Sequence, residues 1–197
     1  MGQAPEVSEM SEPIPGWFAE ESRAELERLI LHHSIRSVVE VGSFMGLSAV
    51  WFARRVDQVF CVDTWYEGAT FESENNLVGT FRRWGYPCPF DFFPLFRRNV
   101  ERSGVWHKIT PIHGASEFVS GEVPHADLVY LDAGHRYEQV KRDIEIYKPK
   151  ARVVLCGDDY TKRKDIDGSK CFGVIEAVTE LLPDHQHVGP FWWWVRK

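Results

Sequence analysis

Three aspartates and one histidine with the chemistry to bind a cation or move a proton follow two apolar runs. Asp132 ends the run 127–132, and Asp158 with Asp159 comes just after the run 151–156. If both runs are parallel strands, their carboxyl ends share one edge of a sheet, where three carboxylates would repel each other. A divalent cation such as Mg²⁺ would neutralise them and accept their oxygens as ligands. Helix caps and tight turns are the alternative use for aspartates at such positions.

His135 lies three residues after Asp132. An imidazole accepts a proton near neutral pH, so His135 is a candidate general base and Asp132 a candidate catalytic partner. Two alternatives stay open, since His135 can also be a metal ligand or the first-turn residue of a following helix. The remaining histidines have no spacing typical of ligands.

A glycine-containing stretch, 40–48, follows another apolar run and holds Glu40, Gly42, Ser43, Gly46 and Ser48. Glycines after a strand let the backbone approach a ligand, but an ordinary strand-to-helix turn uses them as well. The dinucleotide pattern G-x-G-x-x-G is missing, which disfavours an NAD-type oxidoreductase. The carboxylate of Glu40 would attract the ammonium of S-adenosylmethionine and repel a pyrophosphate, so the stretch favours the methyl donor.

Asp63 ends the next apolar run, about 20 residues beyond the loop, where a carboxylate accepts hydrogen bonds from ribose hydroxyls. Dehydrogenases use an acid at the same place. Asp63 therefore predicts a nucleoside-type cofactor without choosing between the two.

The elements that would position these residues alternate along the chain. Strands are predicted at 37–41, 58–63, 108–113, 127–132, 151–156, 185–188 and 191–196, and helices at 17–33, 47–55, 91–102, 135–147 and 172–182. This order predicts an α/β fold with a doubly wound, mostly parallel seven-stranded sheet and an antiparallel C-terminal hairpin. We expect a flexible arm at 1–16 and one domain at 17–197 with an insertion at 64–90. The aromatic rings of this insertion either line a substrate site or pack on the sheet.

Composition narrows the function further. With 197 residues, 44% hydrophobic residues and a formal charge of -6, the chain suits one globular domain without the basic surface of a nucleic-acid binder. No apolar run is long enough to cross a membrane, which predicts a cytoplasmic protein with no membrane association. The run 192–194 of three tryptophans would point to both faces of a strand and either closes the core or forms a homodimer contact.

Four motifs in order over residues 36–160 resemble those of class I methyltransferases, in particular the small cation-dependent O-methyltransferases. The stretch 38–54 resembles the cofactor motif of catechol O-methyltransferase, and Gly114, Ala115, Ser116 and Glu117 are similar to its adenine segment. Residues 132–137 and 156–159 resemble the metal segments. The Gly-His-x-Tyr motif within 132–137 is closer to that of the macrocin O-methyltransferase type. The chain departs from the first type at His135, where that type has a catalytic lysine, and at Asp159, where asparagine is common.

The resemblance implies an S-adenosylmethionine-dependent, Mg²⁺-assisted O-methyltransferase whose acceptor is a small hydroxylated molecule such as a sugar, polyketide or catechol. It implies metal ligation by Asp132, Asp158 and Asp159. The expected cofactor contacts are Glu40, Gly42, Ser43, Gly46, Ser48, Asp63, Gly114, Ala115, Ser116 and Asp132. A non-catalytic module that keeps the cofactor fold as a scaffold is the remaining alternative.

Overall fold

The computed structural model describes residues 13–66, 91–162 and 173–197. Seven strands form one sheet in the order β3-β2-β1-β4-β5-β7-β6. The strands are β1 (Ser37–Val41), β2 (Gln58–Asp63), β3 (Ile109–His113), β4 (Ala126–Leu131), β5 (Ala151–Gly157), β6 (Gln186–Val188) and β7 (Phe191–Val195). All seven agree with the strands predicted from the apolar runs to within one residue at each end.

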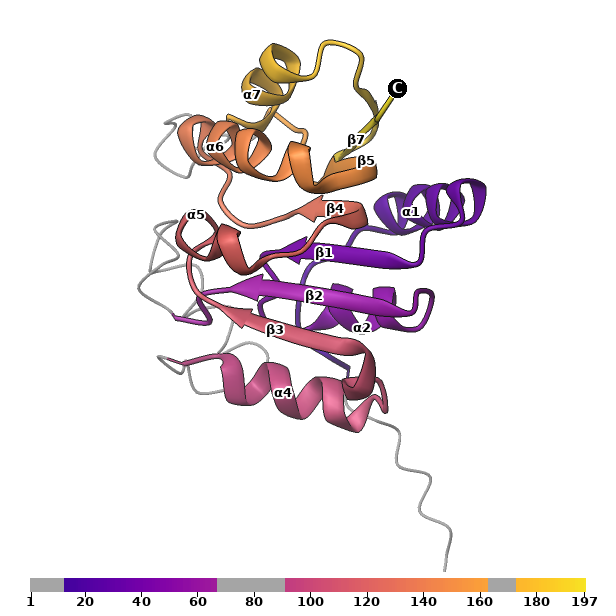
Figure 1. The fold of residues 1–197 in the computed structure, drawn as a ribbon, viewed down its shortest axis with the longest axis vertical. Helices are drawn as coiled ribbons and strands as arrows, with labels where there is room; N and C mark the ends of the chain where they lie inside the picture. The colour runs from indigo at the N-terminus through magenta and orange to yellow at the C-terminus, as the bar shows by residue number, and fades with distance from the viewer. Residues whose placement is uncertain (1–12, 67–90, 163–172) are drawn as a thin grey trace, which may run out of the picture.

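The first five strands are parallel and the last two form an antiparallel hairpin. In Figure 1 the arrowheads of β1 to β4 point to the same side. β1 pairs in parallel with both β2 and β4, so the strand order reverses at β1. Such a reversal opens a crevice beyond the carboxyl ends of the strands, where doubly wound sheets bind their ligands. The predicted fold class is confirmed.

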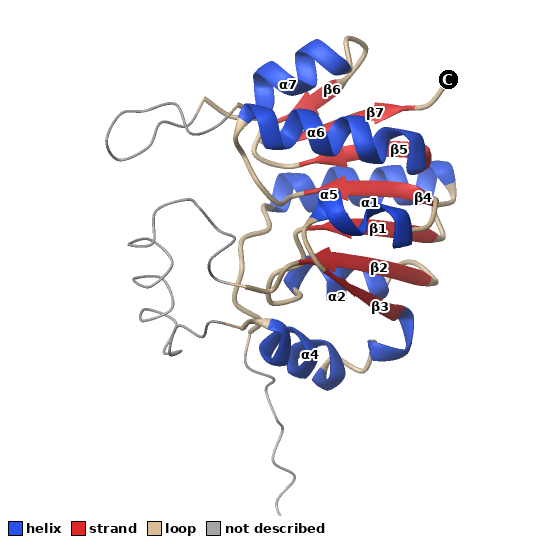
Figure 2. Ribbon diagram, turned by 60° about the vertical axis from the view of Figure 1, so that its left-hand side comes forward, coloured by secondary structure: helices blue, strands red, loops and turns tan. Residues whose placement is uncertain are grey.

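Helices cover both faces of the sheet. One face packs against α1 (Glu20–His33), α2 (Leu47–Ala53) and α4 (Phe93–Arg102), and the other against α6 (Tyr137–Tyr147) and α7 (Val174–Leu181). Figure 2 shows α6 in front of the sheet and α2 behind it. The strands β1 to β5 and β7 divide their side chains between the two layers, as Val38 and Val39 of β1 do, whereas β6 is exposed.

The tryptophan run of β7 closes this core at the hairpin. Trp193 packs in the layer of α1, whereas Trp192 packs in the layer of α6 and α7. β7 lies between β5 and β6, with Trp193 opposite Cys156 and Trp192 opposite Gly157. Core closure therefore accounts for the two buried rings.

The short segments between the main elements carry structure that the apolar periodicity did not reveal. They are α5 (Ser116–Val119), η2 (Trp106–Lys108), η3 (Ser120–Glu122) and η4 (Lys148–Lys150). Within the described ranges, no helix combines the length and apolar character needed to cross a membrane. Residues 1–12 of the predicted arm and 67–90 of the predicted insertion lie outside the described residues.

Candidate active site

The cofactor loop follows β1 and lies directly against the end of β4. Gly42 has a φ of +96°, and a Cβ there would be 2.2 Å from the carbonyl oxygen of Asp132. Gly46, with a φ of +89°, precedes α2. Both glycines are thus required by conformation, and Gly42 also by close packing, so the loop and the aspartate cluster share one edge of the sheet.

Asp63 at the end of β2 fixes the middle of this loop. Its Oδ2 accepts a hydrogen bond of 2.7 Å from the N–H of Phe44, and its Oδ1 accepts one of 2.7 Å from the N–H of Trp65. Phe44 has a φ of +43° and Trp65 a φ of +47°, and Trp65 Nε1 donates to the carbonyl of Phe44. Burial raises the pKa of Asp63, while the N–H groups of Phe44 and Trp65 oppose that rise. The carboxylate that the sequence assigns to ribose therefore also holds the loop.

Trp65 itself belongs to the core. Only 1% of its surface is exposed, and its ring packs against Phe93, Phe96 and His113. For this residue the packing interpretation holds instead of the substrate-lining one. Of the other aromatic residues of the predicted insertion, only Tyr66 lies within the described residues.

Glu40 lies in the layer of α1 and α2, and it is fully buried. Its register neighbours are Cys61 on β2 and Tyr130 on β4, and Cys61 Sγ donates to its Oε2 at 3.6 Å. Burial raises the pKa of Glu40 to about 7, against the polar groups of Ser43, Ser48 and Cys61. Among the described residues, Glu40 Oε1 and Ser43 Oγ have no hydrogen-bond partner of regular geometry. Both atoms therefore have the capacity to hydrogen bond to a bound polar group.

The segment 114–116 follows β3 and begins α5. Ser116 Oγ donates a 2.6 Å hydrogen bond to Oδ1 of Asp143 on α6. Asp143 is buried, which raises its pKa to about 6. Sequence reasoning missed Asp143, although a carboxylate between Val140, Ile144 and Tyr147 on the apolar stripe of a helix was a usable signal.

The acidic cluster forms where β4 and β5 end, as the sequence predicted. Donor atoms of Asp132, His135 and Asp159 all lie within 4.8 Å of one another. His135 Nε2 lies 2.7 Å from Asp159 Oδ2, and Asp159 has a φ of +58°. Burial first, and then the charges of Asp158 and Asp159, hold the pKa of Asp132 well above its usual range. The site therefore favours a bound positive charge.

Asp158 lies beside this group with hydrogen bonds of its own. Ser22 Oγ on α1 donates to its carboxylate at 3.1 Å, and the N–H of Asp159 donates at 3.0 Å. The hydroxyl of Tyr130 lies 3.5 Å from Asp158 Oδ2 and 3.4 Å from Asp132 Oδ2. Sequence reasoning missed Ser22 and Tyr130, because nothing local marks a helix serine 136 residues away as a partner.

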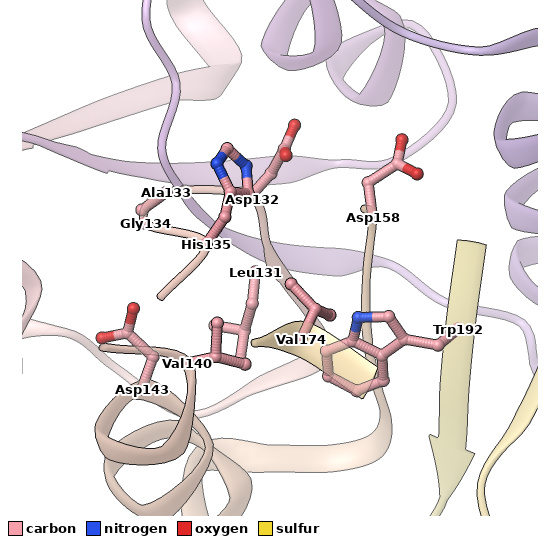
Figure 3. A pocket seen from close by; sticks show the side chains of 10 residues that line it. All are labelled: Leu131, Asp132, Ala133, Gly134, His135, Val140, Asp143, Asp158, Val174 and Trp192. Carbon is pink, nitrogen blue, oxygen red and sulfur yellow. The ribbon is translucent and has the colours of Figure 1, made fainter. Parts of the chain in front are cut away.

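A pocket adjoins the cluster. Figure 3 shows its lining, in which the side chains of Asp132, His135 and Asp158 point to one side, away from Val140 and Val174. The full set is Leu131, Asp132, Ala133, Gly134, His135, Val140, Asp143, Asp158, Val174 and Trp192. Asp143 of α6 therefore lines the same pocket as Asp132, His135 and Asp158.

A doubly wound sheet with a glycine loop, a strand-end carboxylate and an acidic cluster at one edge defines a Rossmann-like protein built for a nucleoside-type cofactor. A family model described as a methyltransferase domain matches residues 39–160, more than half of the chain. The chain belongs to this methyltransferase family, as the sequence motifs indicated. No curated protein sequence gives a significant match.

Solved structures of the same fold include O-methyltransferases. An O-methyltransferase from Bacillus cereus in complex with SAH has a TM-score of 0.63 at 16% identity, covering 93% of this chain and 84% of that chain. A protein described as a caffeoyl-CoA O-methyltransferase, from Staphylococcus aureus, has a TM-score of 0.62 at 13% identity, with coverages of 90% and 83%. The O-methyltransferase of tomaymycin synthesis from Streptomyces achromogenes, in complex with SAM, has a TM-score of 0.54 at 14% identity, with coverages of 87% and 63%.

Proposed function

We propose that this methyltransferase transfers the methyl group of S-adenosylmethionine to a hydroxyl of a small molecule, with a divalent cation at the cluster of Asp132, Asp158 and Asp159. The observation that carries the proposal is the contact of Gly42 with the backbone of Asp132. It joins the cofactor loop to the acidic cluster, so a methyl donor in the loop and a hydroxyl at the cluster would be neighbours. The O-methyltransferase names of the structural relatives point the same way.

The cofactor contacts follow the edge of the sheet. In this proposal the loop from Gly42 to Ser48 receives the methionine part, with the buried Glu40 favouring its ammonium. Asp63 accepts from ribose hydroxyls with the lone pairs that Phe44 and Trp65 leave free. The segment 114–116 lies next, since the N–H of Gly114 donates to the carbonyl of Asp63, and it borders the adenine.

The residues at the cluster fit a divalent cation, because donor atoms of two carboxylates and one imidazole converge there and Asp158 lies beside them. Among the described residues, the pocket lining contains no lysine or arginine. Such an ion, when bound, lowers the pKa of a hydroxyl group beside it. The protein contributes placement, because Tyr130 and Ser22 fix two of the carboxylates. His135 has two roles compatible with its position, as a base oriented by Asp159 or as a ligand.

The acceptor belongs to the class of small hydroxylated molecules. Sugars, polyketide hydroxyls and catechols are the groups to examine, and the tomaymycin enzyme gives a structural relative from natural-product synthesis. Attack by the acceptor oxygen on the sulfonium methyl needs the two reactants held in line, which positioning by the loop and the cluster would supply.

Calorimetry and transfer of a radiolabelled methyl group test the proposal. We expect S-adenosylhomocysteine to bind, NAD⁺ not to bind, and label to reach at least one compound of a panel of catechols, glycosides and polyketides. EDTA should abolish the transfer and added Mg²⁺ or Mn²⁺ should restore it. Cofactor affinity without transfer to any hydroxyl would indicate a non-catalytic module, and full activity in EDTA would remove the cation from the proposal.

A further inference from the structure

Asp143 is a buried carboxyl group that the proposed chemistry does not use. It lies on α6, one turn before Tyr147, and only 6% of its surface is exposed. Among the described residues, the hydroxyl of Ser116 is the one group that donates a hydrogen bond to it, at 2.6 Å. Burial raises the pKa of Asp143 to about 6, so the group is ionised at neutral pH. Burying a carboxylate costs free energy that one neutral donor offsets only in part, so packing alone does not explain this residue.

Ser116 is held against α6 at two points. Its Oγ donates to Asp143 Oδ1, and its backbone carbonyl accepts a 2.9 Å hydrogen bond from the hydroxyl of Tyr147. Tyr147 is fully buried, and an ion pair joins Glu117 of α5 to Arg142 of α6. Asp143 and Tyr147 are four residues apart and therefore share one face of α6. Both the position of Ser116 and the direction of its side chain are thus fixed by α6.

The hydrogen bond to Asp143 also decides where the hydroxyl of Ser116 points its proton. A hydroxyl has one proton and two lone pairs, and an ionised carboxylate can only accept. Because its proton is directed to Asp143, Ser116 Oγ offers lone pairs alone to any further group. Asp143 lines the same pocket as Ala133 and Gly134 at the end of β4, so this pair of side chains lies at the edge of the sheet where the cofactor is proposed to bind (Figure 3).

We infer that Asp143 is a positioning residue for the cofactor: by taking the proton of Ser116, it makes Ser116 Oγ a hydrogen-bond acceptor that selects a 6-aminopurine over a 6-oxopurine. The inference rests on the proposed function for the presence of adenine at segment 114–116. The exocyclic amino group of adenine donates hydrogen bonds, whereas the 6-oxo group of hypoxanthine only accepts them. Hypoxanthine would bring two acceptors together at Ser116 Oγ, and buried acceptors left unpaired weaken binding.

Calorimetry with S-adenosylhomocysteine and S-inosylhomocysteine tests the inference, because the second compound has oxygen in place of the 6-amino group. The unchanged protein should bind S-inosylhomocysteine at least about twentyfold more weakly. In Asp143→Asn the amide can donate to Ser116 Oγ and release the hydroxyl proton toward the ligand, so the preference should fall below about fivefold. Glu145→Gln removes one negative charge from an exposed position of α6 and should keep the full preference.

Ser116→Ala is a second variant, which keeps the inference testable if Asp143→Asn does not fold. It removes the acceptor itself, so its preference should also fall below about fivefold. A merely structural role for Asp143 would weaken the binding of both compounds by the same factor, and an unchanged ratio in Asp143→Asn or Ser116→Ala would overturn the inference. Equal affinities in the unchanged protein would overturn it too, but would leave the methyl-transfer proposal standing. Absence of S-adenosylhomocysteine binding would overturn both.

Discussion

Gly42→Ala should damage both the stability and the cofactor site, because the new methyl group would meet backbone atoms. At the Cβ position the carbonyl oxygen of Asp132 is 2.2 Å away, its carbonyl carbon 2.5 Å and the Cα of Ala133 2.8 Å. A left-handed φ costs a non-glycine residue about 1–2 kcal/mol. Overpacking against atoms that cannot rotate away adds about 1–3 kcal/mol. We expect a total loss of about 2–5 kcal/mol.

Gly104→Ala is the matched control. Gly104 also has a positive φ, of +72°, but a Cβ there meets no atom within 4 Å among the described residues beyond its chain neighbours. It should lose only the conformational part, about 1–2 kcal/mol. Urea unfolding followed by circular dichroism measures both variants, and calorimetry with S-adenosylhomocysteine measures the site.

The two variants separate the two contributions. Gly42→Ala should weaken S-adenosylhomocysteine binding because the clash displaces Asp132 or the loop, whereas Gly104→Ala should bind like the unchanged protein. Equal losses of stability in the two variants, or unchanged cofactor affinity in Gly42→Ala, would refute the reasoning that the loop and the end of β4 are packed at contact distance.

Two further substitutions test the carboxylates next to the loop. In Asp63→Asn the side-chain oxygen can still accept from one of the two N–H groups, of Phe44 or Trp65, but the side-chain NH₂ then faces the other N–H group. The loop loses one hydrogen bond, so S-adenosylhomocysteine affinity should fall at least about tenfold. The exposed Asp57→Asn serves as its control, and equal calorimetric affinities would refute the role of Asp63. For Glu40, a pKa raised from 4.5 to about 7 means that the folded state holds a proton which the unfolded state has released. This contribution to stability is present below pH 4.5 and is lost as the pH rises through 7, by about 3 kcal/mol in all. Glu40→Gln should lack this pH-dependent contribution. Urea unfolding from pH 5 to 8 gives the free energy of unfolding of both proteins as a function of pH, and parallel curves would show that Glu40 does not titrate in this range.

The sequence by itself determined the elements and their order. Apolar runs such as 58–63 are local signals of buried strands, and the alternation of side chains in a strand predicted that Trp192 and Trp193 face different layers. The ends of parallel strands must meet at one edge of a sheet, so the convergence of Asp132 with Asp159 followed from the strand assignment alone.

Only the tertiary structure decided which groups touch within that edge. Ser22 reaches Asp158 across 136 residues, and Ser116 bonds Asp143 across 27, through the packing of helices on the sheet. Periodicity assigns a residue to a face, but it carries no information about the rotation and height at which two distant elements pack. For this reason the sequence marked three aspartates as equivalent metal ligands, whereas the fold gives Asp158 protein partners of its own and brings His135 to 2.7 Å from Asp159.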